Sequence, residues 1–153
     1  MGVGYIIWGR VQVWFHSFSI IHDRYGIQSF PRFPYVVREK EGRTLWEFPL
    51  TTFAIFNFRI PISGGGYIRI MPYSTLKSFL RCINFREKNP FIIYFHPWEL
   101  DPHHPLPKNI PKILILRHTI GINTTKSKLR AVLRDFKFST IREVLNINFH
   151  AGI

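Results

Sequence analysis

Two stretches of the chain have the spacing of apolar residues that is typical of amphipathic helices. Between Ser74 and Phe85, apolar residues recur at intervals of three, four and seven positions, which places them on one helical face. They are Leu76, Phe79, Leu80 and Ile83. Residues 125–136 repeat the pattern with Leu129, Val132, Leu133 and Phe136. Each stretch therefore predicts a helix with one buried face.

Continuous or alternating apolar runs predict strands. Residues 90–93 form an apolar run and predict a buried strand. Residues 45–50 and 51–58 are rich in β-branched and aromatic side chains, and predict two extended segments joined near Pro49. Residues 3–21 alternate loosely between apolar and polar positions and predict one further strand.

Glycine and proline mark the loops between these elements. We expect loops over residues 22–34 and 102–111, and a turn over 40–43. The glycine triplet 64–66 predicts a hairpin or loop corner, or a loop that lets a substrate approach the backbone. It is not a phosphate-binding loop, because no Gly-Lys-Ser/Thr follows it. Residues 137–145 predict a short strand or turn that leads into a helical turn.

The order strand, helix, strand, loop, helix is typical of layered α/β proteins. Few strands are available, so we expect an incomplete core instead of a closed sheet. The chain has 153 residues, 46% of them hydrophobic, which is enough for one domain with its own core. Its single cysteine, Cys82, excludes an intrachain disulfide and a cysteine-based zinc site.

The formal net charge is +12, from 21 Lys and Arg against 9 Asp and Glu. Such a charge favours acidic partners, namely nucleic acid, anionic polysaccharide or a membrane surface. The alternative, which we prefer on the charge alone, is a solvated basic surface. Nucleic-acid binding is further disfavoured, because the sequence has no zinc-finger, RNP-like or helix-turn-helix pattern.

The amino end is apolar, but Arg10, Gln12 and His16 interrupt it well before membrane-spanning length. It also lacks the basic start and the small-residue cleavage site of a signal peptide. We therefore expect no transmembrane segment and favour a cytoplasmic location.

Residues that can carry chemistry gather directly after the predicted strand 90–93. His96, Trp98, Glu99 and Asp101 follow it closely, and the end of a rigid strand is a common place for an active site. The alternative is an ordinary polar turn. A metal site is not expected, because the candidate ligands lack helical i, i+4 spacing. Those ligands are His96, Glu99, Asp101, His103, His104 and His118.

Several strings, taken together, resemble the carboxyl-terminal part of polysaccharide deacetylases of the NodB-homology type. The nearest subgroup is linked to exopolysaccharide biosynthesis and ends in a domain of unknown function. The strings are 22–27 (HDRYGI), 31–34 (PRFP), 47–52 (EFPLTT), 64–69 (GGGYIR), 72–73 (PY), 94–102 (YFHPWELDP), 117–118 (RH) and 133–136 (LRDF). We assign residues 18–153 to this resemblance and leave 1–17 as an unmatched segment.

The resemblance implies part of a distorted (β/α) barrel and metal-dependent hydrolysis of N-acetyl groups on a polysaccharide. In that chemistry, a zinc ion held by one Asp and two His activates water, and a second Asp is the general base. His96 matches the late-strand histidine that acts as general acid, although Tyr94 replaces the family's usual leucine. The resemblance implies site-shaping roles for Trp98, Glu99, Asp101, Gly65, Tyr67, His22 and Asp23.

The metal-binding and base motifs of that family have no counterpart here, since the three aspartates are Asp23, Asp101 and Asp135 and none are adjacent. We therefore expect no metal in this chain, no deacetylase activity from it alone, and an origin as a truncated piece of such an enzyme. The alternative hypothesis is a small basic module that binds polysaccharide or nucleic acid without catalysis.

Overall fold

A computed structural model describes residues 3–7, 31–41, 43–106 and 111–145. At its centre lies a parallel sheet with the order β6 (Phe91–Tyr94), β1 (Val3–Ile7) and β7 (Lys137–Phe138). Gly4 pairs with Phe91 on one side and with Phe138 on the other. The predicted strands at 90–93 and at the start of 3–21 are confirmed, while residues 8–21 lie outside the described ranges.

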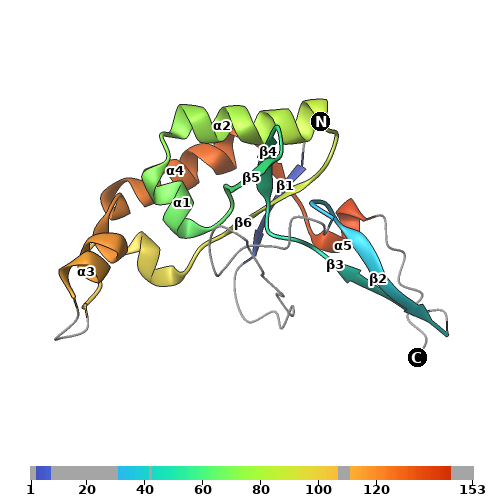
Figure 1. Cartoon of the computed structure of the whole chain (residues 1–153), viewed down its shortest axis with the longest axis horizontal. Coiled ribbons are helices and arrows are strands. Elements are labelled where there is room, and N and C mark those ends of the chain that lie inside the picture. Colours follow the sequence, from blue (N-terminus) through green and yellow to red (C-terminus); the bar gives the residue numbers. More distant parts are fainter. Residues whose placement is uncertain (1–2, 8–30, 42, 107–110, 146–153) are drawn as a thin grey trace.

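Two helices cover one face of this sheet, and both were predicted. They are α2 (Tyr73–Arg81), which continues as a π-helical segment (Cys82–Arg86), and α4 (Ile122–Asp135). Figure 1 shows them above the sheet. Their apolar faces meet the side chains of Phe91 and Ile93 in the main core. The buried residues of this core are Ile62, Ile68, Leu76, Leu80, Ile83, Phe91, Ile93, Val132 and Phe136.

The opposite face of β6 packs on a smaller cluster. Ile92 points away from Phe91 and Ile93, as strand alternation requires, and contacts Phe48. Residues of α5 (Ile141–Val144) pack against this pair. The short strand β7 followed by the helical turn α5 matches the prediction for residues 137–145.

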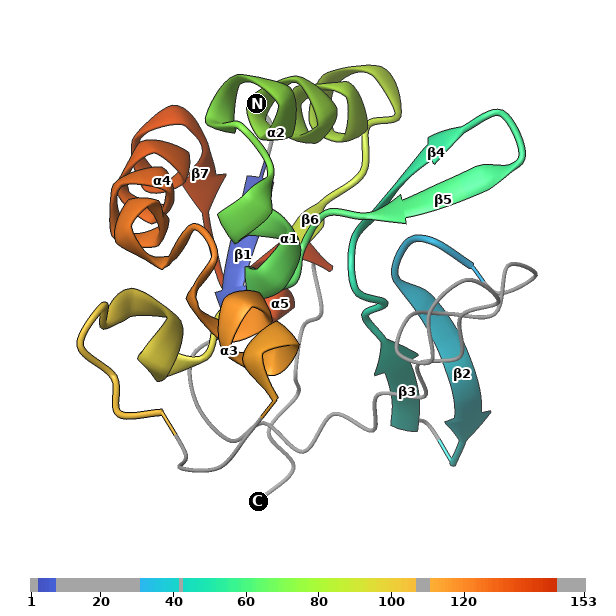
Figure 2. The same ribbon diagram turned by 60° about the vertical axis from the view of Figure 1, so that its left-hand side comes forward.

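Two antiparallel hairpins lie beside each other on one side of the sheet (Figure 2). One joins β2 (Tyr35–Lys40) to β3 (Arg43–Glu47), with its turn in the predicted range 40–43. The other joins β4 (Thr52–Ile55) to β5 (Phe58–Pro61). The prediction of one extended segment over 51–58 was wrong, because the chain reverses direction at Phe56 and Asn57.

Two short helices were not predicted. The glycine triplet was expected in a loop or hairpin corner, but Gly65 and Gly66 form the first turn of α1 (Gly65–Ile70). The apolar run 113–116 belongs to α3 (Lys112–Thr119), none of whose residues is buried. Glycine is a poor helix former, so packing rather than local preference holds α1 in place.

The architecture is mixed α/β, as predicted, but the described residues form no closed barrel. Their strands are divided between the three-stranded sheet and the two hairpins. Within the same ranges, no helix combines the length and the apolar character needed to cross a membrane.

Candidate functional site

A cavity of about 340 Å³ opens at the carboxyl end of β6. Its walls come from α1, from the strand end with the 3₁₀ turn Pro97–Leu100, and from the last turn of α3. The lining residues are Gly65, Gly66, Tyr67, Arg69, Ile70, Tyr94, His96, Trp98, Glu99, Arg117 and His118. Three segments that are far apart in the sequence therefore share one site.

Glu99 is the buried acid of this cavity, with 2% of its surface exposed. One carboxylate oxygen accepts a hydrogen bond from the backbone N–H of His96 at 2.9 Å, which closes the 3₁₀ turn. The carboxylate also packs on Gly65, where a Cβ atom would lie only 1.7 Å from Oε2. Residue 65 therefore has to be glycine for Glu99 to occupy this position.

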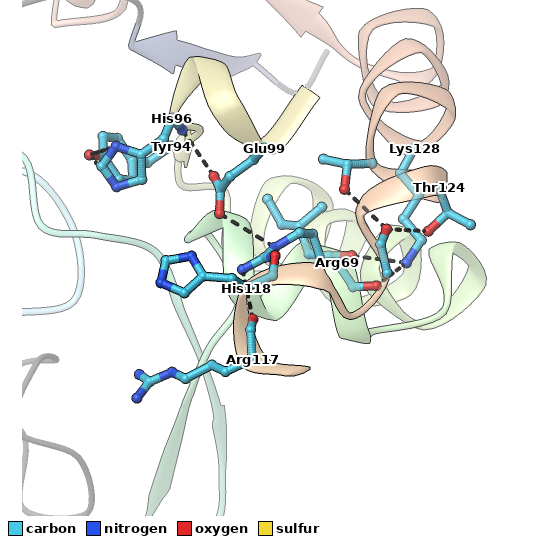
Figure 3. A network of polar contacts seen from close by, with 11 residues as sticks. Arg69, Tyr94, His96, Glu99, Arg117, His118, Thr124 and Lys128 are labelled. Carbon is cyan, nitrogen blue, oxygen red and sulfur yellow. Dashed lines mark hydrogen bonds and ion pairs between the residues drawn. The ribbon is translucent and has the colours of Figure 1, made fainter. Parts of the chain in front are cut away.

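Arg69 is the partner of Glu99. Its Nε atom lies 3.5 Å from Oε1 of Glu99, and both side chains are buried. The guanidinium also donates to the backbone carbonyls of His118 and Arg117 and lies 5.1 Å from the centre of the Trp98 ring. Arg69 thus ties α1, α3 and the 3₁₀ turn together (Figure 3).

His96 is exposed at the mouth of the cavity. The hydroxyl of Tyr94 lies 2.9 Å from both imidazole nitrogens, and the imidazole is stacked near the Trp98 ring with centroids 5.9 Å apart. Burial, and then the negative charge of Glu99, raise the pKa of Tyr94 above its ordinary value. Tyr94 therefore stays a neutral hydroxyl that can donate to His96 or accept from it.

Trp98 is surrounded by basic and titratable rings. The imidazoles of His118 and His104 lie 5.1 and 5.7 Å from its ring centre. On the α1 side, burial raises the pKa of Tyr67, and the positive charge of Arg117 partly opposes that rise. The Tyr67 hydroxyl and the Arg117 guanidinium are therefore close enough to interact electrostatically.

The cavity brings together five of the residues to which sequence reasoning gave a role. Gly65, Tyr67, His96, Trp98 and Glu99 all line it. Asp101 does not, since it is exposed and its carboxylate accepts a hydrogen bond from the His103 backbone at 2.9 Å. The predicted residues His22 and Asp23 lie outside the described ranges.

Sequence reasoning gave no role to Arg69 or Arg117, and considered His118 only as a metal ligand. If Glu99 had been known to be buried, its need for a cationic partner could have identified Arg69. Nothing in the sequence indicated that position 99 would be buried.

The described residues of the cavity do not form a set of ligands for a zinc ion. Among the described residues, no three His, Cys, Asp or Glu side chains are grouped as metal ligands. Glu99 is committed to Arg69 and to the His96 backbone, and the histidines surround Trp98 instead of a common point. The described residues of this site therefore offer an exposed imidazole and aromatic walls.

Comparison with known proteins gives a match that covers most of the chain. The profile of a protein family described as "Domain of unknown function (DUF3473)" matches residues 16–146. No curated protein and no solved structure matches the chain at a significant level. The match includes β6, β7, both cavity-lining helices and the His96 turn, while β1 lies before its first residue, and the chain belongs to the DUF3473 family.

Proposed function

We propose that this chain supplies one wall of the active site of a polysaccharide N-deacetylase, and that it does not hydrolyse acetyl groups alone. The observation that carries the proposal is the exposed imidazole of His96, held by Tyr94 at the end of β6 inside a cavity. Three of the strings that resemble NodB-type deacetylases, residues 64–69, 94–102 and 117–118, contribute side chains to the lining of this cavity. In this proposal the parallel sheet is a segment of the deacetylase barrel.

The residues of this wall donate the proton that the leaving nitrogen needs. Hydrolysis of an N-acetyl group breaks the bond between carbonyl carbon and nitrogen, and the leaving nitrogen must take up a proton. His96 supplies that proton, because histidine is the side chain that most often acts as a general acid. Tyr94 orients the ring through its hydroxyl, and Glu99 fixes the His96 backbone.

The described residues of the cavity lack a group that activates the attacking water. Attack on the carbonyl needs water activated by a base or a metal, and the one carboxylate lining the cavity is paired with Arg69. The resemblance implies zinc in the complete enzyme, but the described residues do not provide its ligands. An isolated proton donor cannot generate the attacking hydroxide, so we expect the chain alone to be inactive.

A binding experiment tests whether the cavity binds sugar, and an activity assay tests whether the chain releases acetate. The chain has four tryptophans, whose indole N–H signals can be resolved by NMR and assigned with Trp98→Phe. Adding a neutral N-acetylglucosamine tetramer should shift the Trp98 signal and leave that of Trp46, on β3, in place. With zinc added, no acetate should be released. An unmoved Trp98 signal would contradict the sugar-binding wall, and catalytic acetate release would contradict the inactivity.

A second candidate is a non-catalytic module that binds polysaccharide or nucleic acid through its basic surface, which the net charge of +12 favours. This function predicts binding to DNA and to acidic polysaccharides alike, with a steep loss of affinity as salt increases. It also predicts no response of the binding to substitutions in the cavity. Absence of binding at low salt would exclude it.

A further inference from the structure

We propose that the sugar bound in this cavity carries an acidic group, such as the carboxylate of a uronic acid, and that Arg117 binds that group. The proposal rests on the proposed function and deepens it, because it specifies the class of polysaccharide. Three observations carry it: the balance of charges around the cavity, the position of the Arg117 guanidinium, and the charge of the whole chain.

The cavity has an excess of positive charge. Its lining contains two arginines and one acid. Glu99 neutralises Arg69, because the two are buried together as an ion pair. Arg117 is left without a compensating acid among the lining residues, and His96 and His118 add no negative charge. A negatively charged group on the ligand neutralises the charge of Arg117.

Arg117 is placed to receive such an anion. Its backbone carbonyl accepts a hydrogen bond from Arg69 at 3.4 Å, which anchors the last turn of α3. Its guanidinium points away from the Glu99–Arg69 pair (Figure 3) and is exposed. Within the described ranges, none of the ion pairs includes Arg117. The anchored backbone therefore holds an available guanidinium at the wall of the cavity.

A carboxylate fits this group better than a neutral hydroxyl does. The planar guanidinium presents parallel N–H donors that match the two oxygens of a carboxylate, and such charge-assisted bonds are about twice as strong as neutral ones. Tyr67 and Trp98, which line the same cavity, offer ring surface to the remainder of the sugar. The net charge of +12 also draws an anionic chain toward the protein.

The test compares two tetrasaccharides of equal length by calorimetry. One is a hyaluronan tetrasaccharide, in which glucuronate alternates with N-acetylglucosamine, and the other is the neutral N-acetylglucosamine tetramer. We expect the hyaluronan tetrasaccharide to bind more tightly by roughly tenfold or more, the effect of one charged hydrogen-bonded pair. Arg117→Gln should abolish this preference. Arg38→Gln, which removes the same charge from an exposed position on β2, should preserve it.

Each contrary result has a distinct meaning. If both tetrasaccharides shift the Trp98 signal and bind equally, the acidic-sugar proposal fails while the proposed function stands. If Arg117→Gln and Arg38→Gln reduce the preference equally, the attraction is general and the Arg117 site is wrong. If a DNA oligonucleotide displaces the hyaluronan tetrasaccharide and needs Arg117, the ligand is a nucleic acid and the proposal is overturned. If neither sugar moves Trp98, both proposals fail.

Discussion

Glu99 has a role in the structure that its place in the sequence does not indicate. In the sequence it is one of several polar residues after a strand, equally suited to a turn or to catalysis. In the structure it is a buried support, because Arg69 and the His96 backbone satisfy its charge. The sequence does not reveal this pairing, because Arg69 lies thirty positions earlier. It belongs to α1, which was not predicted as a helix because it begins with two glycines.

The contact between Glu99 and Gly65 gives the first prediction. Gly65→Ala should destabilise the fold by about 2 kcal/mol or more, because the new methyl group would overlap the Glu99 carboxylate. In a background of Glu99→Ala, where the carboxylate is gone, the same glycine substitution should cost much less. Urea unfolding of the four proteins of this cycle measures both values. Equal costs in the two backgrounds would show that the overlap is not the cause.

Asp135 gives a prediction for pH. Hydrogen bonds from Arg134, Lys77 and Tyr73 hold the pKa of its carboxyl group well below the ordinary value. A lowered native pKa stabilises the fold above the unfolded pKa, which is about 4, and the effect is lost as the pH falls below it. Asp135→Asn should therefore lower the urea midpoint at neutral pH, and the difference should shrink at about pH 3. A difference that does not change with pH would contradict this linkage.

At the scale of elements, the spacing of apolar residues predicted two helices and a strand, whereas the turn residues did not reveal one of the hairpins. The spacing in α2 and α4 and the apolar run of β6 were enough to predict these elements, because their burial follows a simple period. The β4–β5 hairpin was missed because its two-residue turn is Phe56-Asn57 instead of a glycine-containing pair. Phe56 even adopts a positive φ of 50°, which phenylalanine rarely does.

This turn gives the third prediction. Phe56 is 97% exposed, so its ring contributes little packing, while its positive φ costs energy that glycine would not incur. Phe56→Gly should therefore be more stable than Phe56→Ala by about 1 kcal/mol, since alanine retains the unfavourable φ. Thermal unfolding of the two variants makes the comparison. Alanine equal to glycine would mean that the backbone at position 56 is not strained.

Among the described residues, those beside β6 at the outer edge of the sheet belong to loops instead of another strand. Thr51 is buried beside β6, where its hydroxyl donates to the carbonyl of Ile92 at 3.0 Å and accepts from the Ile92 N–H at 2.7 Å. The N–H of Tyr94 donates to Ser63 at 2.8 Å. Loop residues therefore satisfy this edge as a neighbouring strand would.

Thr51 carries the fourth prediction. Thr51→Val keeps the shape of the side chain but leaves the buried N–H and carbonyl of Ile92 without this partner. We expect a loss of about 1–3 kcal/mol in the free energy of unfolding. Thr44→Val, on the exposed face of β3, is the matched control and should have almost no effect. If the two variants unfold at the same urea concentration, the hydroxyl does not support the edge.

For the whole molecule, the α/β class was predictable but the arrangement of strands was not. The sequence indicates which runs are buried, whereas the pairing of β1 with both β6 and β7 depends on contacts between segments more than 80 residues apart. The cavity was predicted along one wall only. Local sequence indicates the strand end that carries His96, but the contact of α3 with that end, between His118 and Trp98, is a long-range outcome.

The surface of the whole molecule carries the last prediction. Four apolar side chains on α3 and at its C-cap are exposed, namely Ile113, Leu114, Leu116 and Ile120, with Ile113 at 68%. An exposed apolar patch on a small protein favours association. We therefore expect the chain to self-associate as its concentration rises in sedimentation velocity, and to unfold over a broad range of urea.

The double variant Ile113→Gln and Leu116→Gln should shift the population toward monomer, because it removes apolar area without changing the charge. Val37→Gln, on the exposed part of β2, is the control for loss of a single apolar side chain elsewhere. A monodisperse monomer at every concentration, with one sharp unfolding transition, would show that this patch does not drive association.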